Sequence, residues 1–240
     1  MAGNGGVVLI LGSAPNAIHA RDWPKDHFDR IVTINNAWRI RSDWDHVVFP
    51  EDFPLSHRPL ALGPGQRAVE AAEFVPAQNR YGGFLHAGAT MAFTAAYWVL
   101  DVLRPRVMAF MGCDMVYPDK GQTHFYGKGA ADPLREDISL RDLEAKSARL
   151  GLLAASGGCA CVNLSPDPSR LVFPRRMPEE LAAMPPVRAD LRAIAVLRAR
   201  ETTLGYTTPG GWHDATGESY RMPALEALDA AWRGLYDATF

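Results

Sequence analysis

The chain has 240 residues, of which 48% are hydrophobic and 22% are charged, so it is long and apolar enough to bury a sizeable core. Its 25 Lys and Arg residues and 27 Asp and Glu residues give a formal net charge of −2, which argues against a general attraction to nucleic acid or to acidic membrane surfaces. We therefore expect any anionic ligand to be met by local donors.

The cysteines and the apolar runs argue against several further classes of protein. Cys113, Cys159 and Cys161 are an odd number without paired metal-ligand spacing, so neither a zinc site nor a disulfide framework is indicated. No apolar run reaches the roughly 20 residues of a membrane span, and no basic-then-apolar leader is visible. We expect a cytoplasmic protein without a transmembrane segment, and we leave peripheral membrane contact and a homo-oligomer open.

Three apolar runs in the first fifty residues predict strands, and each run ends in polar residues. Between the first two runs, residues 17–29 predict a short helix or an irregular crossover that Pro24 interrupts. In a parallel sheet such polar ends meet at one edge, where a ligand crevice forms. The runs are residues 7–11, 31–34 and 46–49, and the polar ends are residues 12–16, 35–36 and 50–52.

The middle of the chain predicts helices, strands and long connections. Residues 54–80 contain several Pro and Gly residues and predict a loop around a short helix at 67–74. The helical periodicity of residues 88–103 predicts the best-buried helix. Residues 107–111 predict a central strand, and residues 117–135 predict a long excursion after it.

The pattern after this excursion predicts one more helix and one more strand. Ser139 and Asp142 have the spacing of a capping box, which would open a helix that runs to about residue 155. Residues 159–164 predict the last strand.

Beyond residue 175 the pattern becomes helical, at residues 178–200 and 222–238. Because strands alternate with helices before that point, we predict an α/β, Rossmann-like fold with a mostly parallel sheet flanked by helices. We expect residues 1–175 to form a Rossmann-like nucleotide-binding domain. Residues 176–240 would be a helical extension or a lid.

The turn after the first predicted strand is the first candidate ligand site. Gly and Ser permit the close approach of a phosphate, and the following helix start attracts negative charge. The turn also fits a plain connection in which Pro15 takes the first helical position. It lacks both the Gly-x-Gly-x-x-Gly pattern and the P-loop lysine, which disfavours nicotinamide cofactors and ordinary ATPase chemistry. Its residues are Gly12, Ser13, Ala14, Pro15 and Asn16.

Two further element ends carry candidate binding residues. The amides of Asn35 and Asn36 would read a base or a ribose, or would form an Asx turn that ends the strand. His86, Gly88 and Thr90 precede the most apolar helix, where Thr90 would bind a phosphate or only cap the helix.

Acidic residues are candidates at two other strand ends. Asp114 follows the central strand, where it would hold a ribose or acceptor hydroxyl or would anchor the loop. Residues 43–45 resemble the metal-binding Asp-x-Asp of many glycosyltransferases but precede a strand, so Glu51 and Asp52 are the better acidic candidates.

The order of these strand ends resembles the bacterial lipooligosaccharide sialyltransferases that use CMP-sialic acid, and a related Rossmann-like group described as pterin diphosphokinase-like. The resemblance spans roughly residues 7–170. In the sialyltransferases the nucleotide lies across these ends, so the resemblance implies a nucleotide site at the matching positions. These are Gly12 and Pro15, Asn35 or Asn36, Gly88, Gly112 with Asp114 and Tyr117, and Ser165 with Pro166.

Two positions depart from the sialyltransferase pattern. Residues 139–142 contain no His where those enzymes carry a catalytic one, and a Pro-Glu-Asp turn at residues 50–52 replaces the Asn after the third strand. We therefore expect the base within residues 112–128.

His124 is the candidate base, and His86 is the reserve candidate. A neutral imidazole can accept a proton from an attacking sugar hydroxyl near pH 7, and Tyr126 or Lys128 would hold phosphate oxygens as the nucleotide leaves. Alternatively, the aromatic residues of this loop only anchor it to the core.

The sequence thus predicts a glycosyltransferase-like enzyme of cell-surface polysaccharide biosynthesis, with His124, Asp114 and Tyr126 in catalysis. It would transfer a nucleotide-activated sugar, such as a CMP-linked acidic sugar, to a glycan hydroxyl without a required cofactor or metal. One alternative is a pterin-type diphosphotransferase with Mg²⁺-dependent ATP binding by Glu51, Asp52 and Asp114. Another is a non-catalytic nucleotide-binding module.

Overall fold

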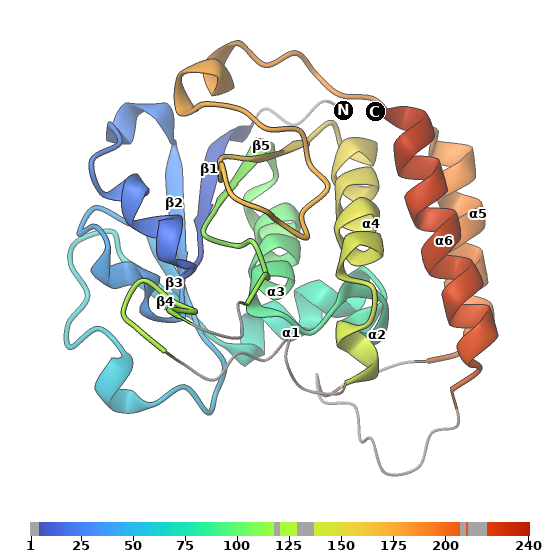
Figure 1. Ribbon diagram of the computed structural model, residues 1–240, viewed down its shortest axis with the longest axis horizontal. Coiled ribbons are helices and arrows are strands. Elements are labelled where there is room, and N and C mark those ends of the chain that lie inside the picture. Colours follow the sequence, from blue (N-terminus) through green and yellow to red (C-terminus); the bar gives the residue numbers. More distant parts are fainter. Residues whose placement is uncertain (1–4, 118–120, 129–136, 207–209, 211–219) are drawn as a thin grey trace.

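The computed structural model describes residues 5–117, 121–128, 137–206, 210 and 220–240. In this part of the chain six parallel strands form one sheet in the order β4-β3-β2-β1-β5-β6 (Figure 1). The predicted α/β fold with a parallel sheet is therefore confirmed. The strands are β1 (Gly5–Leu11), β2 (Arg30–Ile34), β3 (His46–Val48), β4 (Arg67–Val69), β5 (Pro105–Met111) and β6 (Ala160–Asn163).

The central strands are continuous apolar runs because both faces of the sheet are covered. In β1, Val8 and Ile10 belong to one apolar cluster, whereas Val7, Leu9 and Leu11 belong to the other. All five side chains are buried. This alternation explains why the run at residues 7–11 was a reliable strand signal.

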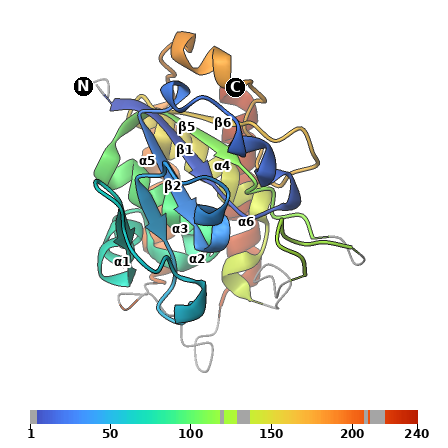
Figure 2. The same ribbon diagram turned by 90° about the vertical axis from the view of Figure 1, so that its left-hand side faces the viewer.

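The two faces of the sheet are covered differently. α-Helices cover one face, whereas 3-10 helices and loops cover the other, which faces the viewer in Figure 2. The helices are α1 (Ala71–Arg80), α2 (Gly83–Ala87), α3 (Met91–Trp98) with a π-helical continuation η5 (Val99–Leu103), and α4 (Leu143–Ser156). The 3-10 helices packed on the second face include η1 (Pro15–Arg21), η3 (Asn35–Arg39) and η8 (Pro178–Ala183).

Two helices near the end of the chain form an outer layer beyond α4 (Figure 1). They are α5 (Leu191–Leu204) and α6 (Met222–Thr239), and they pack against each other. Ile194 of α5 and Trp232 of α6 belong to the same apolar cluster as Val8 of β1. The outer layer therefore shares a core with the sheet.

Several element boundaries differ from the predictions. Residues 67–69 form the edge strand β4, not the start of a helix, and they pair with β3. The predicted helix at residues 178–200 is instead η8 followed by α5, because Pro185 and Pro186 interrupt it.

The start of α4 also differs from the predicted capping box. Ser139 donates its hydroxyl to Asp137 Oδ1 in a preceding 3-10 turn. Asp142 takes the N-cap position, where its carboxylate accepts the N–H of Ala145 at 3.0 Å. A short acceptor side chain directly before the helix therefore replaces the predicted Ser cap.

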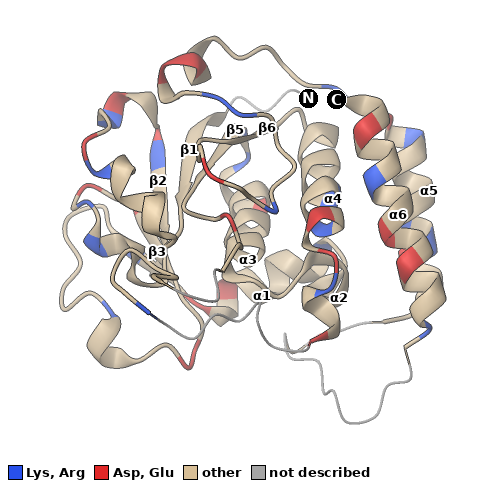
Figure 3. Ribbon diagram, viewed as in Figure 1, with Lys and Arg blue, Asp and Glu red and all other residues tan. Residues whose placement is uncertain are grey.

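Charged side chains of both signs are interspersed over the outer helices and loops, whereas the strands are mostly free of them (Figure 3). Within the described residues, no helix combines the length and the apolar character that crossing a bilayer requires.

Candidate functional site

A cavity of about 610 Å³ lies at the carboxyl ends of the strands. The chain builds β2, β3 and β4 on one side of β1 and then returns to build β5 on the other side. Connections leave β1 and β5 in opposite directions at this point, which is where open α/β sheets form a ligand crevice. The size is that of a small-molecule site. Its lining includes Gly12, Ser13, Ala14, Asn35, Asn36, Asp52, Phe53, Thr90, Gly112, Tyr117, His124, Tyr126 and Lys128.

Gly12 and Gly112 form the floor of the cavity where β1 and β5 end. A Cβ on Gly12 would lie 2.3 Å from the carbonyl oxygen of Gly112, so no larger residue fits there. Gly112 has φ 68°, and a Cβ on it would lie 2.5 Å from that of Ala17. Both glycines are therefore required by the close approach of backbone segments.

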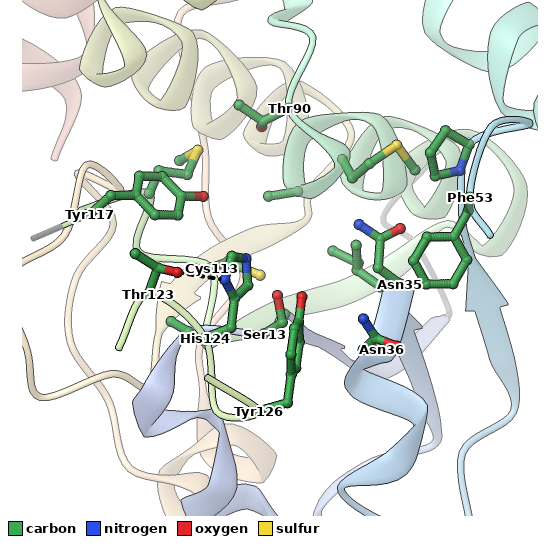
Figure 4. Close-up of a pocket in the computed structure, with 18 of the residues that line it drawn as sticks. Ser13, Asn35, Asn36, Phe53, Thr90, Cys113, Tyr117, Thr123, His124 and Tyr126 are labelled. Carbon is green, nitrogen blue, oxygen red and sulfur yellow. Dashed lines mark hydrogen bonds between the residues drawn. The ribbon is translucent and has the colours of Figure 1, made fainter. Parts of the chain in front are cut away.

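The turn after β1 offers fewer donors to a phosphate than its sequence suggests. The N–H groups of Gly12 and Ala14 donate to the carbonyl oxygens of Met111 and Gly112 at 2.8 and 3.0 Å. Pro15 carries no N–H. In the described structure, the N–H and the hydroxyl of Ser13 are therefore the groups of this turn that can bind a ligand in the cavity. The Ser13 hydroxyl points into the cavity (Figure 4).

The N-terminus of α3 contributes the other donors. Thr90 is the N-cap, and its hydroxyl oxygen accepts the N–H of Phe93 at 3.3 Å. The next two residues, Met91 and Ala92, line the cavity, and N–H groups in a first helical turn have no partner within the helix. The positive end of the helix dipole therefore faces the cavity. Gly88, at φ 89°, shapes the turn before Thr90 without lining the cavity.

The end of β2 places two amides on the cavity wall. Asn36 is 3% exposed, and Asn35 adopts a left-handed conformation with φ 51°. The Oδ1 atoms of both residues are buried without a hydrogen-bond partner in the described structure. An Asx turn would have used these oxygens. Because a buried polar atom without a partner is costly, the two amides are suited to a polar ligand.

The loop after β5 brings His124 to the opposite wall. Phe125 donates its N–H to the carbonyl oxygen of Ser13 at 3.0 Å, which fixes the loop against the turn after β1. The His124 ring stacks on Tyr126 at a centroid distance of 4.9 Å, and its Nδ1 lies 2.9 Å from Thr123 Oγ1. Burial lowers the pKa of His124 below the ordinary value of 6.5. The imidazole is thus neutral at pH 7 and able to accept a proton.

Asp114 and Ser165 lie behind the cavity and do not line it. Asp114 Oδ2 accepts hydrogen bonds from Asn16 Nδ2 at 2.7 Å and from the Ser165 hydroxyl at 2.8 Å. All three residues are buried. This cluster ties together the segments that follow β1, β5 and β6, which agrees with the loop-anchoring alternative for Asp114.

His86 and Glu51 also lie away from the cavity lining. His86 is buried in α2, and this burial lowers its pKa to about 3. Glu51 is exposed. The candidate residues that the structure does not bring to the cavity wall are Pro15, Asn16, Glu51, His86, Gly88, Asp114 and Ser165.

Phe53 is a cavity residue that the sequence analysis did not single out. Its ring stacks on that of Phe49, with centroids 5.6 Å apart and an angle of 21° between the planes. The signal that could have found it is an aromatic residue directly after the Pro-Glu-Asp turn of residues 50–52.

Comparison of the chain with protein-family models, curated proteins and solved structures finds no match. In the described part of the chain, no group of three or more His, Cys, Asp or Glu side chains is arranged to hold a metal ion.

Proposed function

We propose that this cavity binds a nucleotide-activated sugar and that the protein transfers the sugar to a hydroxyl acceptor, as a glycosyltransferase does. The observation that carries the proposal is one cavity at the β1–β5 switch point, lined by the donors of Ser13 and of the first turn of α3 and by the His124 imidazole. The resemblance to sialyltransferases at the same strand ends supports a CMP-linked acidic sugar as the donor.

The site residues divide the reaction between them. The N–H and hydroxyl of Ser13 and the first turn of α3 would stabilise the phosphate as it leaves. His124 would take the proton from the acceptor hydroxyl while its oxygen forms a bond to the anomeric carbon. The bond from that carbon to the phosphate oxygen breaks, and the nucleotide keeps the electron pair. Asp114 would act by positioning, because it anchors the loop beyond Gly112.

Acidic residues fit the diphosphotransferase alternative less well. Its Mg²⁺ would need Glu51, Asp52 and Asp114 in one cluster, but of these three only Asp52 lines the cavity. Asp114 lies behind the cavity, where its Oδ2 is bonded to Asn16 and Ser165. No step is therefore assigned to a metal ion.

Ligand-induced stabilisation tests the proposal at the level of binding. Melting of the wild-type protein would be followed with CMP, UDP, GDP and ATP, each with and without EDTA. A ligand at one hundred times its Kd adds about 2.7 kcal/mol, which raises Tm by roughly 5–10 °C in a chain of this size. We expect a rise with at least one nucleotide that survives EDTA. An unchanged Tm with all four nucleotides would contradict the proposal. A rise in Tm with ATP that EDTA abolishes would favour diphosphotransfer.

Turnover of a nucleotide sugar tests the role of His124. We expect His124→Gln to keep nucleotide affinity and to lose roughly 10²–10⁴-fold in kcat, because a general base is removed. The matched control is His57→Gln, which removes another imidazole from the cavity lining. Because the His57 ring contacts Phe53, this variant should change nucleotide affinity and not kcat. Nucleotide binding without turnover in the wild-type protein would identify a non-catalytic binding module instead.

A further inference from the structure

The cavity wall formed by the residues that follow β2 and β3 differs in chemistry from the wall that carries His124. Asn35, Asn36 and Phe53 lie on one side of the cavity, and Tyr117, Thr123 and His124 lie on the other (Figure 4). The first side combines an aromatic ring with two amides that have unpaired oxygens. These are the groups that recognise a planar polar ring.

We infer that Phe53 is the stacking platform for the heteroaromatic base of the nucleotide, with the amides of Asn35 and Asn36 bonding to the edge of that base. The inference rests on the proposed function and adds the location and chemical class of the ligand's nucleobase. No strand-end motif in the sequence pointed to Phe53.

The packing of Phe53 makes it a rigid platform. Its ring stacks on Phe49, which is 3% exposed, and forms a T-shaped contact with the His57 ring at a centroid distance of 5.9 Å. The guanidinium of Arg58 lies 4.5 Å from the centre of the Phe49 ring and donates to the carbonyl oxygens of Phe53 and Glu51. The loop that carries Phe53 is thus fixed from behind while the residue lines the cavity.

The amides of Asn35 and Asn36 supply the hydrogen bonds that the Phe53 ring cannot form. Asn36 is buried, and the Oδ1 atoms of Asn35 and Asn36 have no partner in the described structure. An amide carries both a donor and an acceptor in one plane, as does the edge of a nucleobase. Both oxygens are enclosed in the described structure, so an amide that turns toward a base edge at this wall would gain the partner that the fold does not give it.

Charge sets the direction of the bound nucleotide. Asp52 lines the cavity beside Phe53, and its carboxylate disfavours a phosphate at that end. Lys128 and the first turn of α3 offer positive charge elsewhere on the lining. The base therefore lies over β2 and β3, and the phosphate lies over α3 and Ser13.

The test compares ligands with and without a base on variants of the same cavity. Dissociation constants for CMP, GMP and ribose 5-phosphate would be measured on the wild-type protein and on Phe53→Ala, Phe53→Leu and Phe53→Tyr. Base stacking is worth about 1–3 kcal/mol, so we expect Phe53→Ala to weaken the tighter nucleotide by roughly 5- to 150-fold. Ribose 5-phosphate should be unaffected, and Phe53→Tyr should bind like wild type.

Two variants control for folding and for position. Phe53→Leu keeps apolar contact with Phe49 but removes the aromatic face, so it should weaken nucleotide binding with little change in stability. Tyr126→Ala removes an aromatic residue from the other wall and should leave the preference for the nucleotide over ribose 5-phosphate intact.

The outcomes separate this inference from the proposed function. Nucleotide binding that Phe53→Ala and Phe53→Leu leave unchanged would overturn the base site and leave the proposed function standing. Equal weakening of nucleotide and ribose 5-phosphate would also overturn it. A wild-type protein that binds none of the nucleotides would overturn both.

Discussion

Two buried polar clusters in this molecule differ in how completely their hydrogen bonds are formed. In the helix layer, Arg149 of α4 bonds to Glu201 of α5 at 2.6 Å, to the Tyr97 hydroxyl at 2.6 Å and to the carbonyl oxygen of Tyr81. Trp232 of α6 donates to the same Glu201 at 2.9 Å. The second cluster is the strand-end cluster, which consists of Asn35 and Asn36 after β2. Its amide oxygens, by contrast, have no partner in the described structure.

Lack of a partner does not by itself mark a ligand site, because in the described structure Asn16 Oδ1, Asp114 Oδ1 and His86 Nε2 also lack one and lie off the cavity wall. The amides of Asn35 and Asn36 combine an unpaired oxygen with a place on that wall. Folded proteins satisfy nearly all of their buried polar atoms, so a satisfied cluster needs no further explanation. The unpaired oxygens of Asn35 and Asn36 do need one, and because both residues line the cavity we propose that a ligand supplies it. We therefore expect the helix-layer cluster to act in stability, and we propose that the amides of Asn35 and Asn36 act in binding.

The largest expected effect comes from breaking the Arg149–Glu201 pair. Their side chains are 1% and 3% exposed, so Glu201→Leu leaves a buried guanidinium without its counter-ion. We expect a loss of about 3–5 kcal/mol in the free energy of unfolding, measured in urea. The double variant Arg149→Met with Glu201→Leu should recover much of it. A single variant that unfolds like wild type would remove the basis for assigning this cluster to stability.

The next effect is a pH dependence from His86. Burial lowers its folded pKa to about 3, against 6.5 in the unfolded chain. Above pH 6.5 both states are neutral, and between about 6.5 and 3 only the unfolded chain takes up the proton, so stability falls as pH falls through this window. At pH 5 the free energy of unfolding is lower than at neutral pH by about 2 kcal/mol from this group. Glu201, with a pKa of about 2, stays ionised throughout most of that window.

The measurement compares unfolding free energies at pH 7.5 and pH 5 for wild type and His86→Gln. The variant should lose less stability on acidification, because it has no imidazole to protonate in the unfolded state. His46, whose burial lowers its pKa to about 4, remains in both proteins and cancels in the comparison. Equal losses in the two proteins would mean that His86 is not held neutral by burial.

Strands and their polar ends were predictable because their signals are local. The apolar run at residues 7–11 encodes β1 in consecutive side chains, and the glycines at positions 12 and 112 mark the ends of adjacent strands. The edge strand β4 has three residues, Arg67–Val69, and shows no such run. Its pairing with β3 decided its structure, and pairing is not visible in a short segment.

The site was predictable only as far as its chemistry is local. Asn35, Asn36 and His124 stood out as polar residues after strands or within a polar loop, and they line the cavity. The N–H groups of Gly12 and Ala14 are bonded to the last residue of β5 and to the residue after it, and this depends on how two distant strand ends meet. The pairing of Arg149 with Glu201 likewise joins two helices through residues that are 52 positions apart in the sequence.

A smaller effect concerns Thr90, which lines the cavity and has a structural role there. Its hydroxyl caps α3 by accepting from Phe93, so Thr90→Ala should lower stability by about 1 kcal/mol, while Thr90→Ser should not. Thermal unfolding of both variants checks this. If the hydroxyl also donates to the ligand, nucleotide affinity will fall in the Ala variant alone; loss of stability in both variants would argue against a hydroxyl cap.

The smallest expected change in stability is at Asn36, and it is the sharpest test of the comparison. Because Asn36 Oδ1 has no partner in the described structure, Asn36→Ala should change the unfolding free energy by no more than about 0.5 kcal/mol while nucleotide affinity falls. Gln78 is the matched control. Its amide is also buried, but it donates to the carbonyl oxygen of Gly88 at 3.0 Å and accepts from the Thr94 hydroxyl at 3.2 Å.

Gln78→Ala should therefore lower the unfolding free energy by about 1–3 kcal/mol. The change leaves the Gly88 carbonyl oxygen and the Thr94 hydroxyl buried without the partner that the native amide provides. Chemical unfolding of the two variants, with and without nucleotide, measures both properties in one experiment. If Asn36→Ala destabilises the free protein as much as Gln78→Ala does, the Asn36 amide belongs to the fold. The contrast between satisfied and unsatisfied clusters would then not identify a binding site.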